Sequence, residues 1–223
     1  MISVIIPVYN EALTLPATLQ RLEKQTAAHE VIIVDGGSHD RTCDIARASP
    51  RVRLLVANKG RATQMNAGAH LAQGEWLVFL HADTLLPDNA LNHIAGLPAH
   101  IQAGGFRHCF SGHDWRLRLI SGINNMRCRI TRIIYGDQAL FVRRHLHARL
   151  GGFPELPFLE DIAFGERLLH VTHPLLLDMA AVTDARRFIK CGVWRSLWRV
   201  AVILLRAQLH LPARNNAFFD DVR

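Results

Sequence analysis

Short apolar runs alternate with helix-like segments over the first 98 residues, and this alternation limits the folds open to the chain more than any other feature. Four runs are rich in the apolar and β-branched residues of buried strands: residues 3–6, 30–34, 52–56 and 76–80. Helical patterns fill the three gaps between them. Because such alternation builds βαβ units, we predict an α/β fold with a mostly parallel, Rossmann-like sheet and helices on both faces.

The three predicted helices have identifiable ends. The first, within 15–22, follows Thr14, which we predict to be its N-cap. The second covers 40–48, and the third, 61–73, is rich in alanine and ends at Gly74, its predicted C-cap. Right-handed crossovers then place the loops that follow the strands on one edge of the sheet, where ligands of open α/β sheets bind.

The pattern after Pro98 is less regular, but no Gly/Ser linker, internal repeat or low-complexity tract interrupts it. Strands are predicted at 104–110 and 138–142, and a helix at 161–170. We therefore expect one domain over residues 1–223 rather than two.

Charge and cysteine content restrict the partners. The chain has 26 Lys and Arg against 19 Asp and Glu, a net charge of +7 that favours anionic partners. The arginines form no dense run and no nucleic-acid motif is present, so we predict no nucleic-acid partner. The four cysteines are far apart, as in reduced cytosolic proteins. With no secretory signal and no apolar run of about 20 residues, a cytoplasmic location is expected.

Acidic residues follow three of the predicted strands. Glu11 follows the first, Asp35 ends the second and Asp83 follows the fourth. Carboxylates gathered at one sheet edge can hydrogen-bond a nucleoside or hold a divalent metal that carries a diphosphate. Each acid alone is equally well explained as a turn former or helix cap, since Asp35 precedes two glycines and Asp83 precedes a threonine. Together they indicate a ligand site.

Two strings make a family resemblance specific. Ser-Val-Ile-Ile-Pro-Val-Tyr-Asn-Glu at 3–11 and Val-Asp-Gly-Gly-Ser-His-Asp-Arg-Thr at 34–42 resemble the opening of glycosyltransferase family 2. Further matches follow in the family's order: 61–68, 79–84, 136–138 and 160–161. The Ala-Arg-Arg-Phe string at 185–188 is similar to one compact bacterial subgroup, which also has a His-Ala-Asp metal motif. The resemblance covers most of the chain and implies the GT-A fold.

The same resemblance divides the single GT-A domain into parts. It implies a nucleotide-binding half at 1–98 and an acceptor-side half at 99–190, followed by an amphipathic helix and tail at 191–223. The nucleotide pocket would be formed by residues from the first strand ends and the third helix: Pro7, Tyr9, Glu11, Asp35, Arg61 and Asn66. Arg61 would reach the nucleotide phosphates, which suit a guanidinium; the alternative is a solvated arginine in the first helical turn.

His81-Ala82-Asp83 occupies the place of the family's Asp-x-Asp metal motif. The resemblance implies that Asp83 binds Mn²⁺ or Mg²⁺, which neutralises the charge of the leaving nucleoside diphosphate. His81 replaces the first Asp of the motif and would be the second ligand. Because an imidazole also accepts softer ions, the choice of metal stays open.

Glu160-Asp161 resembles the family's catalytic acid pair. The resemblance makes Asp161 the general base that deprotonates the acceptor hydroxyl, so that the anomeric centre is inverted. Glu160 would line the donor-sugar and acceptor side together with Gly136, Asp137 and Gln138. The alternative is that both acids only favour a helix N-terminus.

Arg186 and Arg187 follow an apolar run at 175–179 and would stabilise the departing diphosphate. The alternative explanation is a solvated basic turn.

Residues 193–206 have an amphipathic helical pattern, with Trp194 and Trp198 at the border between apolar and basic faces. Such a helix can lie in an anionic membrane interface, which would suit a lipid-linked acceptor and a membrane-peripheral location. Alternatively it packs on the core of the enzyme while its arginines face water.

We therefore predict an inverting, metal-assisted glycosyltransferase that moves a sugar from a nucleoside-diphosphate sugar to an acceptor hydroxyl. A nucleotidyltransferase is disfavoured. Such enzymes usually carry a glycine-rich loop with Arg or Lys directly after the first strand, whereas the loop at 7–11 has no glycine and no cation. The other alternative is a non-catalytic protein that binds a sugar nucleotide or a membrane surface. The presence of Asp83 and Asp161 argues against this non-catalytic alternative, and a measurement of catalytic turnover distinguishes it from an enzyme. The sugar, the base, the acceptor and the oligomeric state stay open.

Overall fold

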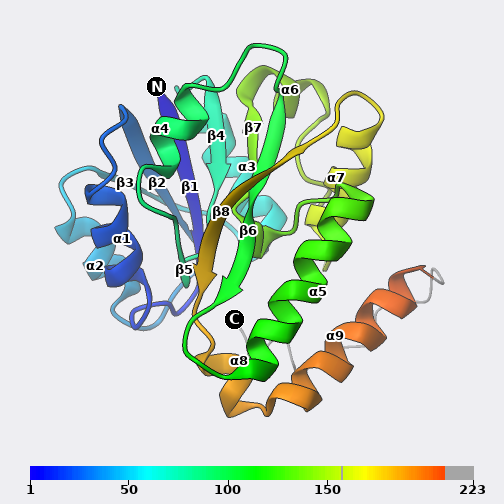
Figure 1. The fold of residues 1–223 in the computed structure, drawn as a ribbon. Coiled ribbons are helices and arrows are strands. Elements are labelled where there is room, and N and C mark those ends of the chain that lie inside the picture. The colour runs from blue at the N-terminus through cyan, green and yellow to red at the C-terminus, as the bar shows by residue number, and fades with distance from the viewer. Residues whose placement is uncertain (157, 209–223) are drawn as a thin grey trace.

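The computed structural model describes residues 1–156 and 158–208, which fold around an eight-stranded sheet (Figure 1). The strands lie in the order β3-β2-β1-β4-β7-β6-β8-β5. Their bounds are β1 Ile2–Val8, β2 His29–Asp35, β3 Val52–Val56, β4 Trp76–Phe79, β5 Thr84–Leu85, β6 Ala103–Phe110, β7 Phe141–Arg143 and β8 Leu175–Thr183. The helices are α1 Leu15–Glu23, α2 Thr42–Ala48, α3 Arg61–Leu71, α4 Ala90–Ala95, α5 Trp115–Thr131, α6 Arg144–Arg149, α7 Glu160–Leu169, α8 Arg186–Lys190 and α9 Val193–Gln208, with a 3₁₀ turn at Gly136–Gln138.

The first half of the sheet is parallel, as predicted. β1 pairs in parallel with β2 and β4, and β2 pairs in parallel with β3. The carboxyl ends of these strands therefore share one edge. β7 joins β4 and β6 in antiparallel fashion, and β8 then runs parallel to β6. β5 pairs with the end of β8, so the sheet runs through both halves of the chain.

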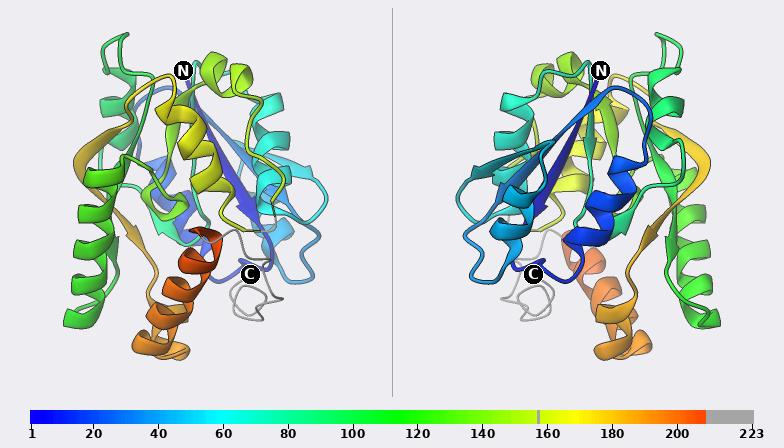
Figure 2. Two further views of the ribbon diagram at one scale, coloured as in Figure 1. Left: turned by 90° about the vertical axis from the view of Figure 1, so that its right-hand side faces the viewer. Right: turned by 90° about the vertical axis from the view of Figure 1, so that its left-hand side faces the viewer.

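Helices cover both faces of the sheet, which also confirms the prediction (Figure 2). On one face, Leu15, Leu19 and Leu22 of α1 share a buried cluster with Val4 and Ile6 of β1. Residues of α2 and α4 complete this layer. The alternation of β1 turns its other residues toward the second face.

On that second face, Ile5 shares a buried cluster with Met65 of α3 and Phe164 of α7. His147 of α6 lies in this layer against the rings of Phe79 and Phe164. Burial lowers the pKa of His147 to about 4, so its ring is neutral at pH 7. It is a core residue rather than a metal ligand.

One predicted helix end is wrong, and a second is confirmed in position but not in its hydrogen bond. α3 ends at Leu71, and Gly74 lies beyond it, where a Cβ would come within 2.6 Å of the Ser3 backbone nitrogen. Gly74 is therefore needed for the close approach to β1, not as a C-cap. Thr14 does occupy the N-cap position of α1, but its hydroxyl donates to Glu11 Oε2 at 2.8 Å instead of accepting from the helix.

The predicted strand at 138–142 is also shorter than expected. Residues 136–138 form the 3₁₀ turn, and Ala139 has a φ of 47°, which an extended strand does not allow. β7 therefore starts only at Phe141. The turn directs residues 136 and 137 toward the strand-end edge.

Gly104 on β6 supports a stability prediction. A Cβ there would lie 2.3 Å from the carbonyl oxygen of Leu175 and 2.5 Å from the ring of Phe141. We expect Gly104→Ala to lower the free energy of unfolding by about 2–3 kcal/mol in urea denaturation, because neighbouring strand backbone must move. Gly122→Ala in α5 is the matched control: nothing lies within 4 Å of its Cβ, so that variant should gain up to about 1 kcal/mol. Equal stabilities would contradict the prediction.

Candidate active site

A cavity of about 300 Å³ opens at the edge where β1 and β4 end. Six further segments surround it: the N-terminus of α3, the end of β6, the 3₁₀ turn, the N-terminus of α7, the end of β8 with α8, and one residue of α9. Its polar and charged walls come from Tyr9, Glu11, Lys59, Arg61, Gln64, His81, Asp83, Tyr135, Asp137, Glu160, Asp161, Thr183, Asp184 and Arg187. Strand-end loops thus converge on one site, as the parallel topology predicts.

The segment between β4 and β5 fixes Asp83 at the floor of this cavity. The carbonyl oxygen of Asp83 accepts a hydrogen bond from the Asp184 backbone at 2.9 Å. Next to it, the hydroxyls of Thr84 and Thr183 lie 3.1 Å apart. Asp83 is therefore fastened to the end of β8, which brings α8 to the site.

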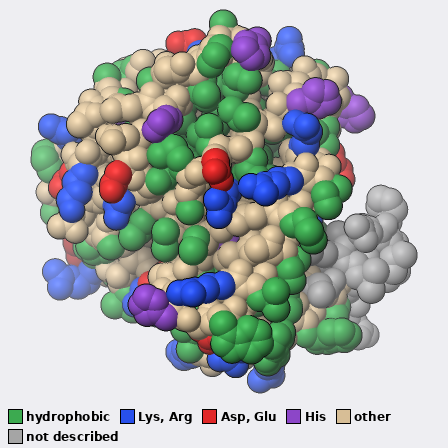
Figure 3. Space-filling view, in the orientation of Figure 1, with side chains coloured by type: hydrophobic (Ala, Val, Ile, Leu, Met, Phe, Trp, Pro, Cys, Tyr) green, Lys and Arg blue, Asp and Glu red, His purple; other side chains and the backbone are tan. Residues whose placement is uncertain are grey.

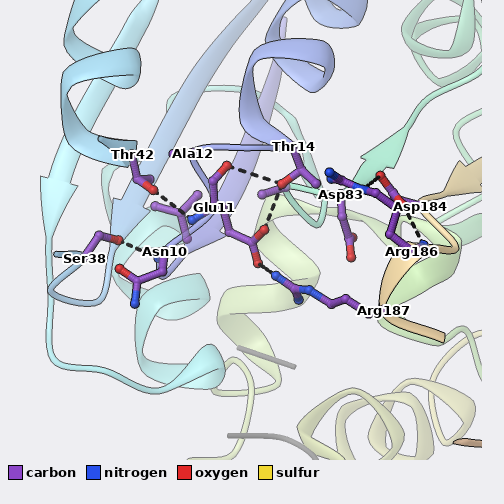
Figure 4. A network of polar contacts seen from close by, with 12 residues as sticks. Asn10, Glu11, Ala12, Thr14, Ser38, Thr42, Asp83, Asp184, Arg186 and Arg187 are labelled. Atoms are coloured by element: carbon purple, nitrogen blue, oxygen red, sulfur yellow. Dashed lines mark hydrogen bonds and ion pairs between the residues drawn. The ribbon is translucent and has the colours of Figure 1, made fainter. Parts of the chain in front are cut away.

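Glu11 connects this floor to α8 (Figure 4). Its Oε1 accepts from Arg187 Nη2 at 2.6 Å and its Oε2 accepts from the Thr14 hydroxyl at 2.8 Å. The Asp83 carboxylate points toward this pair in Figure 4. Enclosure of Asp83 raises its pKa and the charge of Glu11 raises it further, while Arg187 opposes the rise.

Arg61, Glu160 and Asp161 form a second charged group across the cavity. Arg61 is the first residue of α3, and its Nη1 lies 3.2 Å from Glu160 Oε1. The Glu160 side chain is 1% exposed. Arg61 therefore does more than contact solvent, and Glu160 does more than favour a helix N-terminus.

Asp161 is held by two backbone groups. Its Oδ2 accepts from the Gly136 N–H and its Oδ1 from the Ile162 N–H, each at 2.9 Å. Enclosure and then the charge of Glu160 raise the pKa of Asp161 to about 6, against the opposing effect of Arg61 and the two N–H groups. Asp161 lines the cavity, so a carboxyl group with this raised pKa lies where a substrate could meet it.

Gly136 is required by close packing as well as by this hydrogen bond. A Cβ at Gly136 would lie 2.5 Å from His81 Nε2, so the imidazole packs directly on the glycine. Among the residues that the structure describes, no three His, Cys, Asp or Glu side chains form a group able to hold a metal by themselves. His81 and Asp83 are therefore not part of a group of three such side chains.

The surroundings of Asp83 nevertheless fit a hard divalent cation. Mg²⁺ is commonly held by one or two carboxylates while substrate phosphates and water complete its shell. Asp83 is enclosed beside a second carboxylate, Glu11, whose charge disfavours its ionised form. A cation brought in with a diphosphate would relieve that repulsion.

Several cavity residues were missed by the sequence reasoning, among them Lys59, Tyr135 and Asp184. Lys59 places its Nζ 3.8 Å from the centroid of the Tyr9 ring, and Tyr135 and Asp184 line the opposite side. Lys59 lies just before the predicted α3 N-terminus, where phosphates bind, and this could have identified it. Tyr135 and Asp184 adjoin the motifs at 136–138 and 186–187, but their types alone carry no signal.

Four predicted site residues lie outside the cavity lining. Asp35 uses Oδ2 to accept from the N–H groups of Gly37 and Ser38, both at 2.9 Å, so it forms the turn after β2. The others also have local partners: Asn66 exchanges two hydrogen bonds with the Phe153 backbone, Gln138 accepts from the Tyr135 N–H, and Arg186 pairs with Asp184. The remaining predicted residues line the cavity, with Pro7 and Tyr9 on the β1 side.

The predicted C-terminal helix is present as α9 and begins by packing on the protein. Val193 shares a small buried cluster with Leu117 of α5 and Ala185, whereas Trp194 and Trp198 are exposed. Within residues 1–156 and 158–208, no helix is long and apolar enough to cross a bilayer. The predicted tail beyond Gln208 lies outside the described residues.

Curated relatives match part of the chain. A PGL/p-HBAD biosynthesis glycosyltransferase of Mycobacterium bovis is 44% identical over 93 residues, which are 39% of this chain and 36% of that protein. An undecaprenyl-phosphate 4-deoxy-4-formamido-L-arabinose transferase of Aeromonas hydrophila is 36% identical over 98 residues, 39% of this chain and 30% of that one. The matches therefore span about a third of these relatives' length.

Solved structures share the fold over most of the chain. Residues 1–349 of TarS from S. aureus, in complex with UDP-GlcNAc, superpose with a TM-score of 0.66 at 23% identity, covering 83% of this chain and 58% of that one. The mannosyltransferase PcManGT of Pyrobaculum calidifontis, in complex with GDP-Man and Mn²⁺, gives 0.64 at 22% identity over 81% and 56%. The fold is thus of the GT-A type. The family model described as glycosyl transferase family 2 matches residues 3–149, and the chain belongs to that family.

Proposed function

We propose that the chain transfers a sugar from a nucleoside-diphosphate sugar to an acceptor hydroxyl with inversion, assisted by a divalent metal. The observation that carries the proposal is Asp161, a carboxyl group that titrates near pH 6 inside a cavity lined by acids and cations. A general base works best when its pKa lies close to the operating pH.

Three cations line the cavity: Lys59, Arg61 and Arg187. Lysine and arginine suit the oxygens of a diphosphate, arginine in bidentate fashion. Asp83 would hold the metal, which when bound supplies charge neutralisation at the leaving diphosphate. Structural neighbours whose titles name UDP-GlcNAc, or GDP-Man with Mn²⁺, support this class of donor. His81 as a second metal ligand stays a prediction.

The proposed step needs an ionised Asp161. Its carboxylate takes the proton from the acceptor hydroxyl, whose oxygen bonds to the anomeric carbon as the bond to the diphosphate breaks on the opposite face. Gly136 and Ile162 orient the carboxylate through their N–H groups. Such fixed geometry supplies much of the rate of a displacement reaction.

Part of the cavity lining is apolar and comes from Phe110, Leu159, Phe188 and Val200. An acceptor with an apolar portion next to its hydroxyl would fit, and we propose a lipid-linked one. The relative named for undecaprenyl-phosphate supports this class of acceptor.

Donor binding is tested by thermal stability with UDP, GDP, CDP, ADP or dTDP, each with and without Mn²⁺ or Mg²⁺. A ligand at about 100 times its dissociation constant adds about 2.7 kcal/mol, which raises the Tm of a chain of this size by roughly 5–10 °C. We expect one diphosphate to do so only with metal, and Asp83→Asn to abolish the metal-dependent shift.

Asp88→Asn is the matched control, because Asp88 is exposed and pairs with Arg21 on the surface. It should keep the full shift. If no diphosphate raises the Tm of the wild-type chain, the proposed donor class is wrong. If a diphosphate binds but its sugar nucleotide is never turned over, the non-catalytic binding protein is favoured instead.

A further inference from the structure

Helix α5 exposes an apolar stripe where a surface helix normally carries polar residues. Its inner side is fixed to the protein by Leu117, Ser121 and Cys128, which are buried. The outer stripe consists of five exposed residues spaced three or four apart: Trp115, Leu119, Ile123, Met126 and Ile130. That spacing puts them on one face of the helix, over about 25 Å. Because the inner side of α5 already packs on the core, the outer stripe is available to contact another partner.

The stripe continues onto the C-terminal helices. The rings of Trp115 and Trp194 lie 6.4 Å apart, edge to face, and Ile189 and Trp198 are exposed nearby in sequence. Ile130 is 75% exposed at one end and Trp198 is 72% exposed at the other. Hydrophobic side chains gather over α5 at the lower right of the face drawn in Figure 3. We call these eight residues of α5, α8 and α9 the apolar stripe.

Arginines accompany the apolar stripe, and three of them pair with acids: Arg116 with Asp114, Arg186 with Asp184 and Arg187 with Glu11. Residues 115–136 contain five arginines and 185–208 contain six Arg and Lys, and neither range has an Asp or Glu. The whole chain has 26 basic and 19 acidic residues, so everything outside these two ranges is net acidic. On α5 the exposed Arg118 and Arg129 lie on one flank of the stripe. The exposed apolar residues therefore belong to two segments that carry more basic than acidic side chains.

We infer that the apolar stripe docks onto the surface of a bilayer that contains anionic lipids. Apolar residues with exposed tryptophans enter the boundary between headgroups and acyl chains, while arginines reach anionic headgroups. The inference extends the expectation for residues 193–206 by making α5 the main contact. A second copy of the chain fits less well, because facing stripes would bring these basic segments together.

The inference does not depend on sugar transfer, so it is tested by sedimentation with vesicles. The full chain is mixed with phosphatidylcholine vesicles with or without about 30% phosphatidylglycerol. We expect it to sediment with the anionic vesicles and to be released by raised salt. Leu119→Gln, Ile123→Gln and Met126→Gln together should weaken this binding at least about tenfold.

The matched control removes three exposed apolar residues elsewhere: Leu13→Gln, Val56→Gln and Val171→Gln. It should bind vesicles like the wild type, and circular dichroism should show that both triple variants are folded. The inference is overturned if the wild type stays in solution, or if the α5 variant binds as well as the control. It is also overturned, in favour of a second copy, if the wild type is a dimer that ignores vesicles and the α5 variant is a monomer.

Discussion

Asp161→Asn is expected to lower kcat by about a thousandfold or more, because loss of a positioned general base typically costs 10²–10⁴ in rate. The amide keeps the size of the side chain, but it has one oxygen in place of two and can accept from only one of the N–H groups of Gly136 and Ile162. It cannot take a proton from a hydroxyl. The measurement is the rate of nucleoside-diphosphate release from the sugar nucleotide whose diphosphate raises the Tm.

The pH dependence gives an independent signature of the same residue. With the pKa of Asp161 at about 6, the carboxylate fraction rises through pH 6, so kcat should rise with pH and level off above about 7. Stability should move the other way. The folded pKa is above the unfolded value of 3.8, so this contribution to stability is complete below about pH 4 and is lost as pH rises through 6. Asp161→Asn should therefore lack this dependence of stability on pH.

The control for both measurements is Asp178→Asn. Asp178 pairs with Arg107 on the exposed side of β8, and that pairing holds its pKa below the usual range. Its loss should leave kcat and the pH profile near pH 6 unchanged. A rate for Asp161→Asn within tenfold of wild type, or a profile that keeps its inflection near pH 6, would remove Asp161 from the role of base.

Arg61→Met is expected to lower the free energy of unfolding by about 3–4 kcal/mol at pH 7. Glu160 is 1% exposed and has Arg61 as its ion-pair partner. Removing one partner of a buried pair leaves an uncompensated charge, which typically costs 3–5 kcal/mol; the lower part of that range applies because the Arg61 side chain keeps 29% of its surface. The Tm should fall by roughly 10 °C.

The double variant Arg61→Met with Glu160→Gln separates this cause from lost packing. Replacing the acid by a neutral amide removes the stranded charge, so the double variant should recover much of the lost stability. Arg53→Met is the surface control, because its pair with Glu30 is partly exposed and should be worth at most about 1 kcal/mol. Purely additive effects of the Arg61 and Glu160 changes would mean that the pair contributes nothing.

Sequence patterns predicted the parallel part of the fold because its signals are local. The run at 3–6 became β1 and the alanine-rich stretch became α3, since buried apolar runs and helix periodicity decide such elements. Gly74 was wrongly assigned because its role is set by Ser3, 71 residues away. Likewise the turn at 136–138 serves His81 and Asp161, which no local pattern reveals.

The site shows the same division between local and distant causes. Strand-end position correctly brought Glu11 and Asp83 to the cavity, because parallel strands end at one edge. It also suggested Asp35, whose carboxylate accepts from the N–H groups of Gly37 and Ser38 in the turn after β2. The apolar stripe was not predicted, since 115–132 shows only arginines mixed with apolar residues until the core contacts show which face is buried.

The ion pair of Glu11 and Arg187 has a consequence for the order in which the protein can mature on the ribosome. The two residues are 176 positions apart, so β1 and β4 are synthesised well before α8 appears. Until then Glu11 and Asp83 have no Arg187 to oppose their repulsion, although the parallel strands around them can already pair. The nascent chain would therefore have its parallel strands before its working site, and the segment around Arg187 would complete both the charge balance of the cavity and its wall when it emerges.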